Sequence, residues 1–114
     1  IALSTNTSII TAIANDFGFE EIFSRQLQSI AGENDLVVGI STSGKSKNII
    51  KATEYAKGQG LKVVGFLGKD GGDLKSITDI SLTIPQSETP CIQEMHILAG
   101  HIICAIVEEH FMKK

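Results

Sequence analysis

The sequence predicts an α/β fold: a three-layer αβα sandwich around a mostly parallel sheet. Three short apolar runs, at residues 36–40, 61–67 and 80–84, have the length and continuity of strands that are buried on both faces. Apolar residues recur at helical spacing in the segments between these runs. Strands that alternate with helices are typical of right-handed βαβ units, which build parallel sheets covered by helices.

The part of the chain before the first strand is expected to hold two helices. Residues 1–4 are apolar and begin without Met, so we expect them to be the tail of a buried strand in a chain whose first part is missing. Residues with helix-capping side chains at 5–8 favour a helix start, and the segment 15–19 is expected to break that helix. A second helix is expected over residues 20–31, with Gly32 as its stop.

The later elements alternate regularly. The helix after the first strand is expected to end at Gly58 and Gly60. A turn over residues 68–72 follows the second strand, and a short helix is expected over residues 74–77. A long helix is expected over residues 92–111. Ligands of such sheets bind beyond the carboxyl ends of the strands, so the loops that follow the strands are the candidate sites.

Length and composition indicate one ordinary domain. The chain has 114 residues and a formal net charge of −3, which excludes a large basic footprint for nucleic acid. No continuous apolar run approaches the roughly 20 residues that span a bilayer, so we expect no membrane partner. Cys91 and Cys104 form no CxxC pattern, and we interpret both as unpaired thiols, Cys104 in a helix core and Cys91 in a loop.

The strongest local signal is the loop after the first predicted strand. Four hydroxyl side chains fall within six residues: Ser41, Thr42, Ser43 and Ser46. The loop opens a helix, and the first turn of a helix offers unpaired N–H groups and a positive dipole end to a phosphate. Gly44 allows close approach of the backbone. The spacing is neither that of a P-loop nor that of a dinucleotide loop. The plain structural interpretation is a turn capped by Ser46, and both interpretations stay open at this point.

Four segments resemble a known family. The run Ile40-Ser41-Thr42-Ser43-Gly44 resembles the signature of the sugar-isomerase (SIS) domain. Three others look like phosphoheptose isomerase, also called sedoheptulose 7-phosphate isomerase: residues 14–19, residues 68–72, and the run Ile92-Gln93-Glu94-Met95-His96 together with His101. The similarity is colinear over essentially the whole chain. It implies an SIS-type sandwich in which residues 1–114 are a single, incomplete SIS domain without the family's N-terminal helices and first strand.

The resemblance also implies a function. Family members interconvert a ketose and an aldose, turning sedoheptulose 7-phosphate into D-glycero-D-manno-heptose 7-phosphate through an enediol, an early step toward the heptose of bacterial surface polysaccharide. They are cytoplasmic homotetramers with active sites between subunits, and several bind zinc there. Their N-terminal part carries a His and a Glu that complete the metal and catalytic set.

Residue roles follow from the same resemblance. Ser41, Thr42, Ser43 and Ser46 would hold the phosphate, and Asn15 and Asp16 would contact the sugar. Gln93 and His101 would bind substrate or zinc, with His101 also the catalytic acid–base residue. Two departures stand against this: the missing N-terminal part, and Cys91 at a position where the family commonly has Arg.

Several of these residues also have plain structural interpretations. Without the resemblance, Asn15 and Asp16 would be a helix cap or an Asx-turn. Gln93 and His101 share one helix face and can point into one pocket, whereas His96 lies on another face. Residues 68–72 are interpreted as a turn rather than a site.

Two other functions stay open. One is a binding module, either a non-catalytic SIS sugar-phosphate sensor or a relative that binds a replication initiator. The other is an interaction domain that keeps the tetrameric scaffold and binds no sugar.

Overall fold

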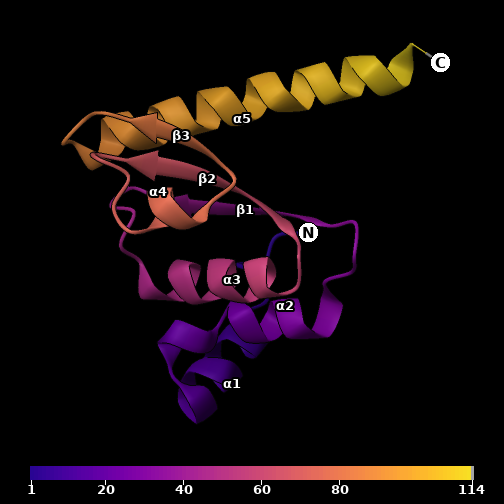
Figure 1. Cartoon of the computed structure of the whole chain (residues 1–114), viewed down its shortest axis with the longest axis vertical. Helices are drawn as coiled ribbons and strands as arrows, with labels where there is room; N and C mark the ends of the chain where they lie inside the picture. Colours follow the sequence, from indigo (N-terminus) through magenta and orange to yellow (C-terminus); the bar gives the residue numbers. More distant parts are fainter. Residues whose placement is uncertain (114) are drawn as a thin grey trace.

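The computed structural model describes residues 1–113, and they form a three-layer α/β sandwich around a parallel sheet (Figure 1). The sheet contains β1 (Leu36–Ser41), β2 (Lys62–Gly68) and β3 (Ile80–Ile84), in the order β1-β2-β3. Both neighbouring pairs are parallel. The predicted α/β class and the parallel sheet are therefore confirmed.

Helices cover both faces of this sheet. On one face lies α3 (Lys47–Gly58), with α2 (Ser24–Ile30) packed behind it and α1 (Thr7–Phe17) beyond (Figure 1). The single-turn 3-10 helix η1 (Phe19–Glu21) links α1 to α2. On the other face lies α5 (Thr89–Met112). The short helix α4 (Leu74–Ile77) contacts α3 and β2.

The core lies between α2, α3 and the central strand. It is built from Leu27, Ala52, Ala56, Leu61 and Val63, and Ala56 and Val63 have no exposed surface. Burial of apolar area at this junction is the main force that holds the helical layer to β2. The candidate loop between β1 and α3 is thereby fixed at both of its ends.

Two expectations for the first third of the chain were wrong in detail. Residues 1–4 are not a strand, because they pair with no neighbour and only Leu3 packs against the core. The first helix does end within residues 15–19 as expected, and the break comes at Gly18, the C-cap that follows Phe17. The expected helix over residues 20–31 is divided into η1, a turn and α2, so that Ile22 can turn into the interior.

The expectation that all strands are buried on both faces holds only for β2. In β1, Leu36, Val38 and Ile40 are each more than half exposed, while the residues between them point toward α3. The cause is the position of α5, which packs on β2 and β3 and leaves one face of β1 open. A continuous apolar run does not reveal whether a second layer covers it.

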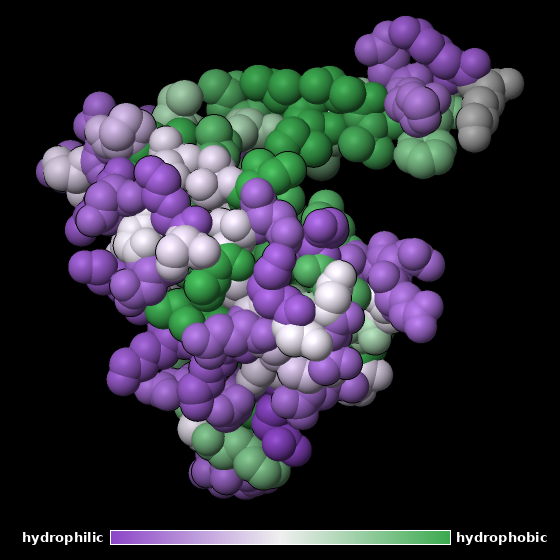
Figure 2. All heavy atoms as spheres, in the orientation of Figure 1, coloured by the Kyte–Doolittle hydropathy of each residue, from purple (hydrophilic) through white to green (hydrophobic). Residues whose placement is uncertain are grey.

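The C-terminal part of α5 extends past the sheet (Figure 1). Only Ile92 and His96 of this helix are buried, and apolar side chains cover much of its length in the space-filling view (Figure 2). Cys91 lies in its first turn rather than in a loop, and Cys104 is exposed rather than in a core, although both are unpaired as expected.

Helix α5 is also long and apolar enough to cross a membrane by length and composition, although polar residues interrupt its apolar sequence. Its first half packs on the sheet and the helix carries Gln93, Glu94 and three histidines. These features favour packing against protein rather than lipid.

Asp79 joins the ends of three elements. Its carboxylate accepts a hydrogen bond from the Val63 N–H at 2.8 Å and pairs with Lys57 Nζ at 2.7 Å. The hydrogen bond from the Lys57 ammonium, followed by the one from the Val63 N–H, lowers the pKa of Asp79 to about 2. The ionised carboxylate thus holds the start of β2 beside the end of α3.

We expect Asp79→Ala to lower the melting temperature at pH 7. A carboxyl whose pKa is depressed by folding stabilises the protein above its unfolded pKa of about 3.8, and this stabilisation is lost as the pH falls toward about 2. The difference in melting temperature between wild type and variant should therefore narrow below about pH 4. Asp73→Ala, an exposed carboxyl without a side-chain cap bond, is the control. A difference that stays constant down to about pH 3 would contradict this role.

Candidate functional site

The hydroxyl-rich loop lies at the carboxyl edge of the sheet, where such folds bind ligands. Strand β1 ends at Ser41 and α3 begins at Lys47, so the loop leads directly into the first turn of a 12-residue helix. Strand β2 ends beside it, because Ser41 is paired with Leu67 in the parallel register. The structure thus brings the predicted phosphate-binding residues together at one place.

The hydroxyls of this loop bond within the loop. The Ser41 and Ser46 Oγ atoms lie 2.9 Å apart, and the Gly44 N–H donates to Ser41 Oγ at 3.1 Å. The Lys45 N–H donates to Ser43 Oγ at 3.2 Å. Ser46 occupies the N-cap position of α3, yet its side chain makes no cap hydrogen bond. The plain interpretation of the loop as a Ser46-capped turn is therefore not what the structure adopts; in the first turn of α3, the Asn48 side chain accepts a hydrogen bond from the Ile49 N–H at 2.9 Å.

Helix α5 is held to this edge of the sheet by its first two turns. His96 is 5% exposed, and its Nε2 lies 2.9 Å from the carbonyl oxygen of Leu67. The geometry has Nε2–H donating to that oxygen, while Nδ1 has no partner. The His96 ring also lies 5.7 Å from the Phe66 ring. His96 is a structural anchor, in agreement with its predicted place on a different helix face from Gln93.

Gln93 and His101 both lie on α5, and His101 does not face the loop of its own chain. Both are exposed, and His101 follows the buried Ile92 by nine residues, which is about two and a half helical turns. His101 therefore lies on the side of α5 opposite the side that packs on the sheet. One chain therefore does not supply both the loop and His101 to the same site.

Asn15 and Asp16 lie on a different element, α1. Both are exposed on α1, which carries no buried residue and packs against η1. The Asn15 amide donates to the Asp16 carboxylate at 3.1 Å, so the two side chains form one polar pair.

Residues 1–113 by themselves do not assemble a zinc site. Among residues 1–113, no group of three or more His, Cys, Asp or Glu side chains is placed to hold a metal. A zinc ion usually takes four ligands, and Gln93 and His101 would supply two. The residues present therefore fit at most half of such a site.

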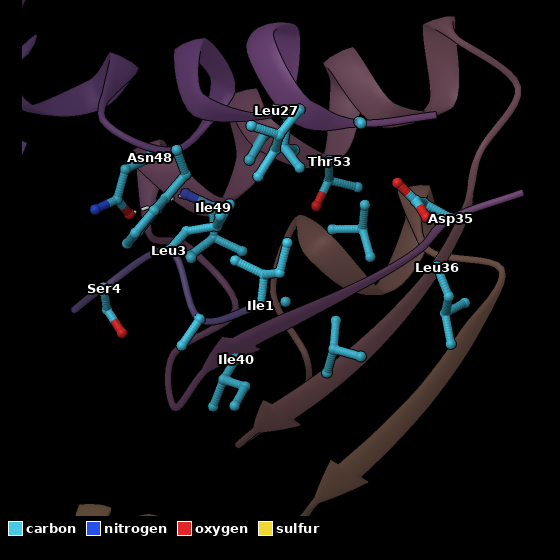
Figure 3. A pocket seen from close by; sticks show the side chains of 18 of the residues that line it. Ile1, Leu3, Ser4, Leu27, Asp35, Leu36, Ile40, Asn48, Ile49 and Thr53 are labelled. Carbon is cyan, nitrogen blue, oxygen red and sulfur yellow. Dashed lines mark hydrogen bonds between the residues drawn. The ribbon is translucent and has the colours of Figure 1, made fainter. Parts of the chain in front are cut away.

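A pocket lies elsewhere, along the outer edge of β1. It has a volume of about 690 Å³ and is lined by residues 1–4, by β1 and by apolar side chains of α2 and α3 (Figure 3). Ile1, Leu3 and Leu36 line it, and Ser46 is the only loop residue that it reaches. Its lining is too apolar for a phosphate. We interpret it as the open edge of the sheet beside β1.

Comparison with known proteins identifies the family. Residues 1–68 match the model of the SIS domain, and the chain belongs to the SIS domain family. It is similar to phosphoheptose isomerases: that of a Nitratiruptor species is 52% identical over 111 residues, 97% of this chain and 59% of the relative. That of Trichlorobacter lovleyi is 56% identical over 109 residues, 96% of this chain and 56% of the relative.

Solved structures agree. A phosphoheptose isomerase from Neisseria gonorrhoeae matches with a TM-score of 0.92 and 41% identity, over 94% of this chain and 61% of that one. One from Francisella tularensis matches with the same TM-score at 38% identity, over 96% of this chain and 59% of that one. The chain spans about three-fifths of the length of the curated relatives it matches.

We expect His96→Ala to destabilise the protein without a matching loss of activity in the folded fraction. Removing a buried ring and its hydrogen bond should cost about 2–4 kcal/mol. His110→Ala, at an exposed histidine of the same helix, should cost less than about 0.5 kcal/mol. Urea unfolding at one fixed protein concentration measures both. Equal midpoints for the two variants would contradict the anchor role of His96.

Proposed function

We propose that the complete protein is a ketose–aldose isomerase that converts sedoheptulose 7-phosphate into D-glycero-D-manno-heptose 7-phosphate through an enediol. The observation that carries the proposal is the hydroxyl-lined loop of Ser41, Thr42, Ser43 and Ser46 at the start of α3. The similarity to phosphoheptose isomerases over nearly the whole chain supports the same reaction.

The loop is suited to the terminal phosphate of such a substrate. Hydroxyls and backbone N–H groups donate to phosphate oxygens, and the dipole of α3 favours the negative charge. The loop contains no group that could transfer a proton from carbon at neutral pH. Its role is therefore to bind and orient the sugar, and the proton transfer falls to residues outside it.

We infer that His101 takes part in this proton transfer at a site shared between subunits of a homotetramer. An imidazole changes its protonation state near neutral pH, as the enediol pathway requires. His101 lies one helical turn from the exposed apolar side chains of Ile97 and Leu98. An apolar surface of this kind is normally covered, and a neighbouring subunit on it would enclose His101 next to another subunit's loop.

Asn15, Asp16 and Gln93 complete the proposal. The polar pair Asn15–Asp16 would contact sugar hydroxyls, and Gln93 would bind substrate or join His101 as a zinc ligand, with further ligands from outside this chain. When bound, zinc would polarise the substrate carbonyl. A cytoplasmic location belongs to the same proposal, since the thiols of Cys91 and Cys104 are unpaired.

Replacing Ser43 and Ser46 together with Ala should raise the KM for sedoheptulose 7-phosphate at least roughly tenfold. Each lost hydrogen bond to a charged phosphate is worth about 1.5–3 kcal/mol. Ser8→Ala, at an exposed hydroxyl in the first turn of α1, should leave KM unchanged. An unchanged KM in the double variant would refute the phosphate role. Phosphosugar binding without any turnover by the wild type would instead favour a non-catalytic SIS module or the initiator-binding relative.

His101→Ala should lower kcat by roughly 10²–10⁴-fold, the range expected for an acid–base group, while His110→Ala should change it little. Co-expression of His101→Ala with the Ser43/Ser46 double variant tests the shared site. At a substrate concentration where each variant alone is inactive, random mixing should restore about a quarter of the sites. A wild-type kcat for His101→Ala, or mixed tetramers without activity, would overturn the assignment.

A further inference from the structure

The turn over residues 68–72, which its sequence indicates to be a turn rather than a site, lies directly against the candidate phosphate loop. Where the two segments come closest, each has a glycine, with φ of 65° at Gly44 and 52° at Gly72. A Cβ atom built on Gly44 would lie 1.9 Å from the carbonyl oxygen of Gly71. One on Gly72 would lie 2.7 Å from the carbonyl oxygen of Gly44. No side chain fits between the two segments, so they pack backbone to backbone.

Two further contacts extend this junction. The Leu74 N–H donates to the carbonyl oxygen of Gly44 at 3.0 Å, which ties the loop to the start of α4. At the other end of the turn, a Cβ on Gly68 would lie 2.3 Å from the carbonyl oxygen of Thr42 and 2.6 Å from Ile92 Cδ1. The loop is therefore held at Thr42 and at Gly44, and Ile92 of α5 supports the turn from behind.

Asp70 holds the turn in this shape. Its carboxylate accepts a hydrogen bond from the Gly72 N–H at 3.0 Å, as in an Asx-turn. Hydrogen bonds from backbone N–H groups, first that of Gly72, lower the pKa of the Asp70 carboxyl. The positive charges of Lys45 and Lys75 contribute less to this shift. The carboxylate acts on the Gly72 backbone and donates nothing to an anion.

We propose that Gly72 and Asp70 are positioning residues for phosphate binding: they press the turn against Gly44 and so set the loop in its anion-binding shape. The inference rests on the proposed function of the loop and adds a second element to it. The four hydroxyls supply the hydrogen bonds, and the turn supplies the geometry in which these bonds meet one phosphate.

Gly72→Ala is the direct test, made in the complete protein. Its methyl group must separate the turn from Gly44, so the KM for sedoheptulose 7-phosphate and the inhibition constant of inorganic phosphate should both rise at least roughly tenfold, with kcat changed less. Gly60→Ala is the matched control. Gly60 has a φ of 77° but open space around its Cβ position, so this variant suffers similar backbone strain and should keep the wild-type phosphate affinity.

A second pair of variants separates positioning from charge. Asp70→Ala removes the acceptor for Gly72 and also removes a negative charge near the loop. Charge alone would tighten anion binding, whereas positioning predicts an inhibition constant for phosphate that rises about threefold or more. Asp70→Asn keeps an acceptor oxygen and loses the charge, so phosphate should bind at least as tightly as in wild type.

The outcomes distinguish the inference from the function on which it rests. If wild type neither turns over the sugar phosphate nor is inhibited by phosphate, the proposed function fails. If wild type binds and Gly72→Ala binds equally well, only the positioning role is overturned. If Gly72→Ala does not fold, the Asp70 pair decides: tighter binding by Asp70→Ala overturns the inference, and weaker binding that Asp70→Asn restores supports it.

Discussion

The parallel pairing of β1 with β2 is the constraint on which the rest of this structure depends. In this register Ser41 lies opposite Leu67, so the two strands end together and their following loops emerge side by side. The hydroxyl-rich loop and the glycine turn can then pack backbone to backbone. The carbonyl oxygen of Leu67 lies at the same edge and accepts the hydrogen bond from His96. Loop, turn and long helix thus meet at one point because two strands share one register.

The layer of α2 and α3, on the face of the sheet opposite α5, makes the carboxyl edge of the sheet rigid. Helix α3 packs closely on β1, since a Cβ on Gly39 would lie only 3.0 Å from Ile49 Cγ2. Ala52 and Ala56 then bring α3 into contact with Leu27 and Val63. Close packing of this kind leaves little room for α3 to shift. The first turn of α3, toward which a bound phosphate would be directed, is fixed by a core that lies well away from it.

Helix α5 has an anchored part that is covered by the sheet and a part that remains uncovered. Its first two turns are anchored through Ile92 and His96, whereas residues from Ile97 onward present an apolar surface with little cover. The open face of β1 is similar in character. Both surfaces have the composition of an interior rather than of an exterior. His101, the residue proposed for proton transfer, lies on the uncovered part of α5, while the candidate phosphate loop lies near its anchored part.

The sequence by itself determined the elements and the place of the site. The alternation of apolar runs and helical spacing was enough for the parallel sheet, and the cluster of Ser41, Thr42, Ser43 and Ser46 after a strand was enough for the candidate loop. These features depend on residues that are close together in the sequence, so they can be recognised without the structure. The resemblance added the family, which the comparisons then confirmed.

Only the tertiary structure decided which face of each element is covered. The apolar runs of β1 and α5 predicted burial, yet both remain largely open, because burial depends on which other layer reaches them. Helical spacing placed Gln93 and His101 on one face of α5, but packing turned His101 away from the loop of its own chain. The contact of Gly72 with Gly44 could not be predicted from the sequence either. It joins two loops that lie far apart in the sequence and meet only because β1 and β2 end at the same edge.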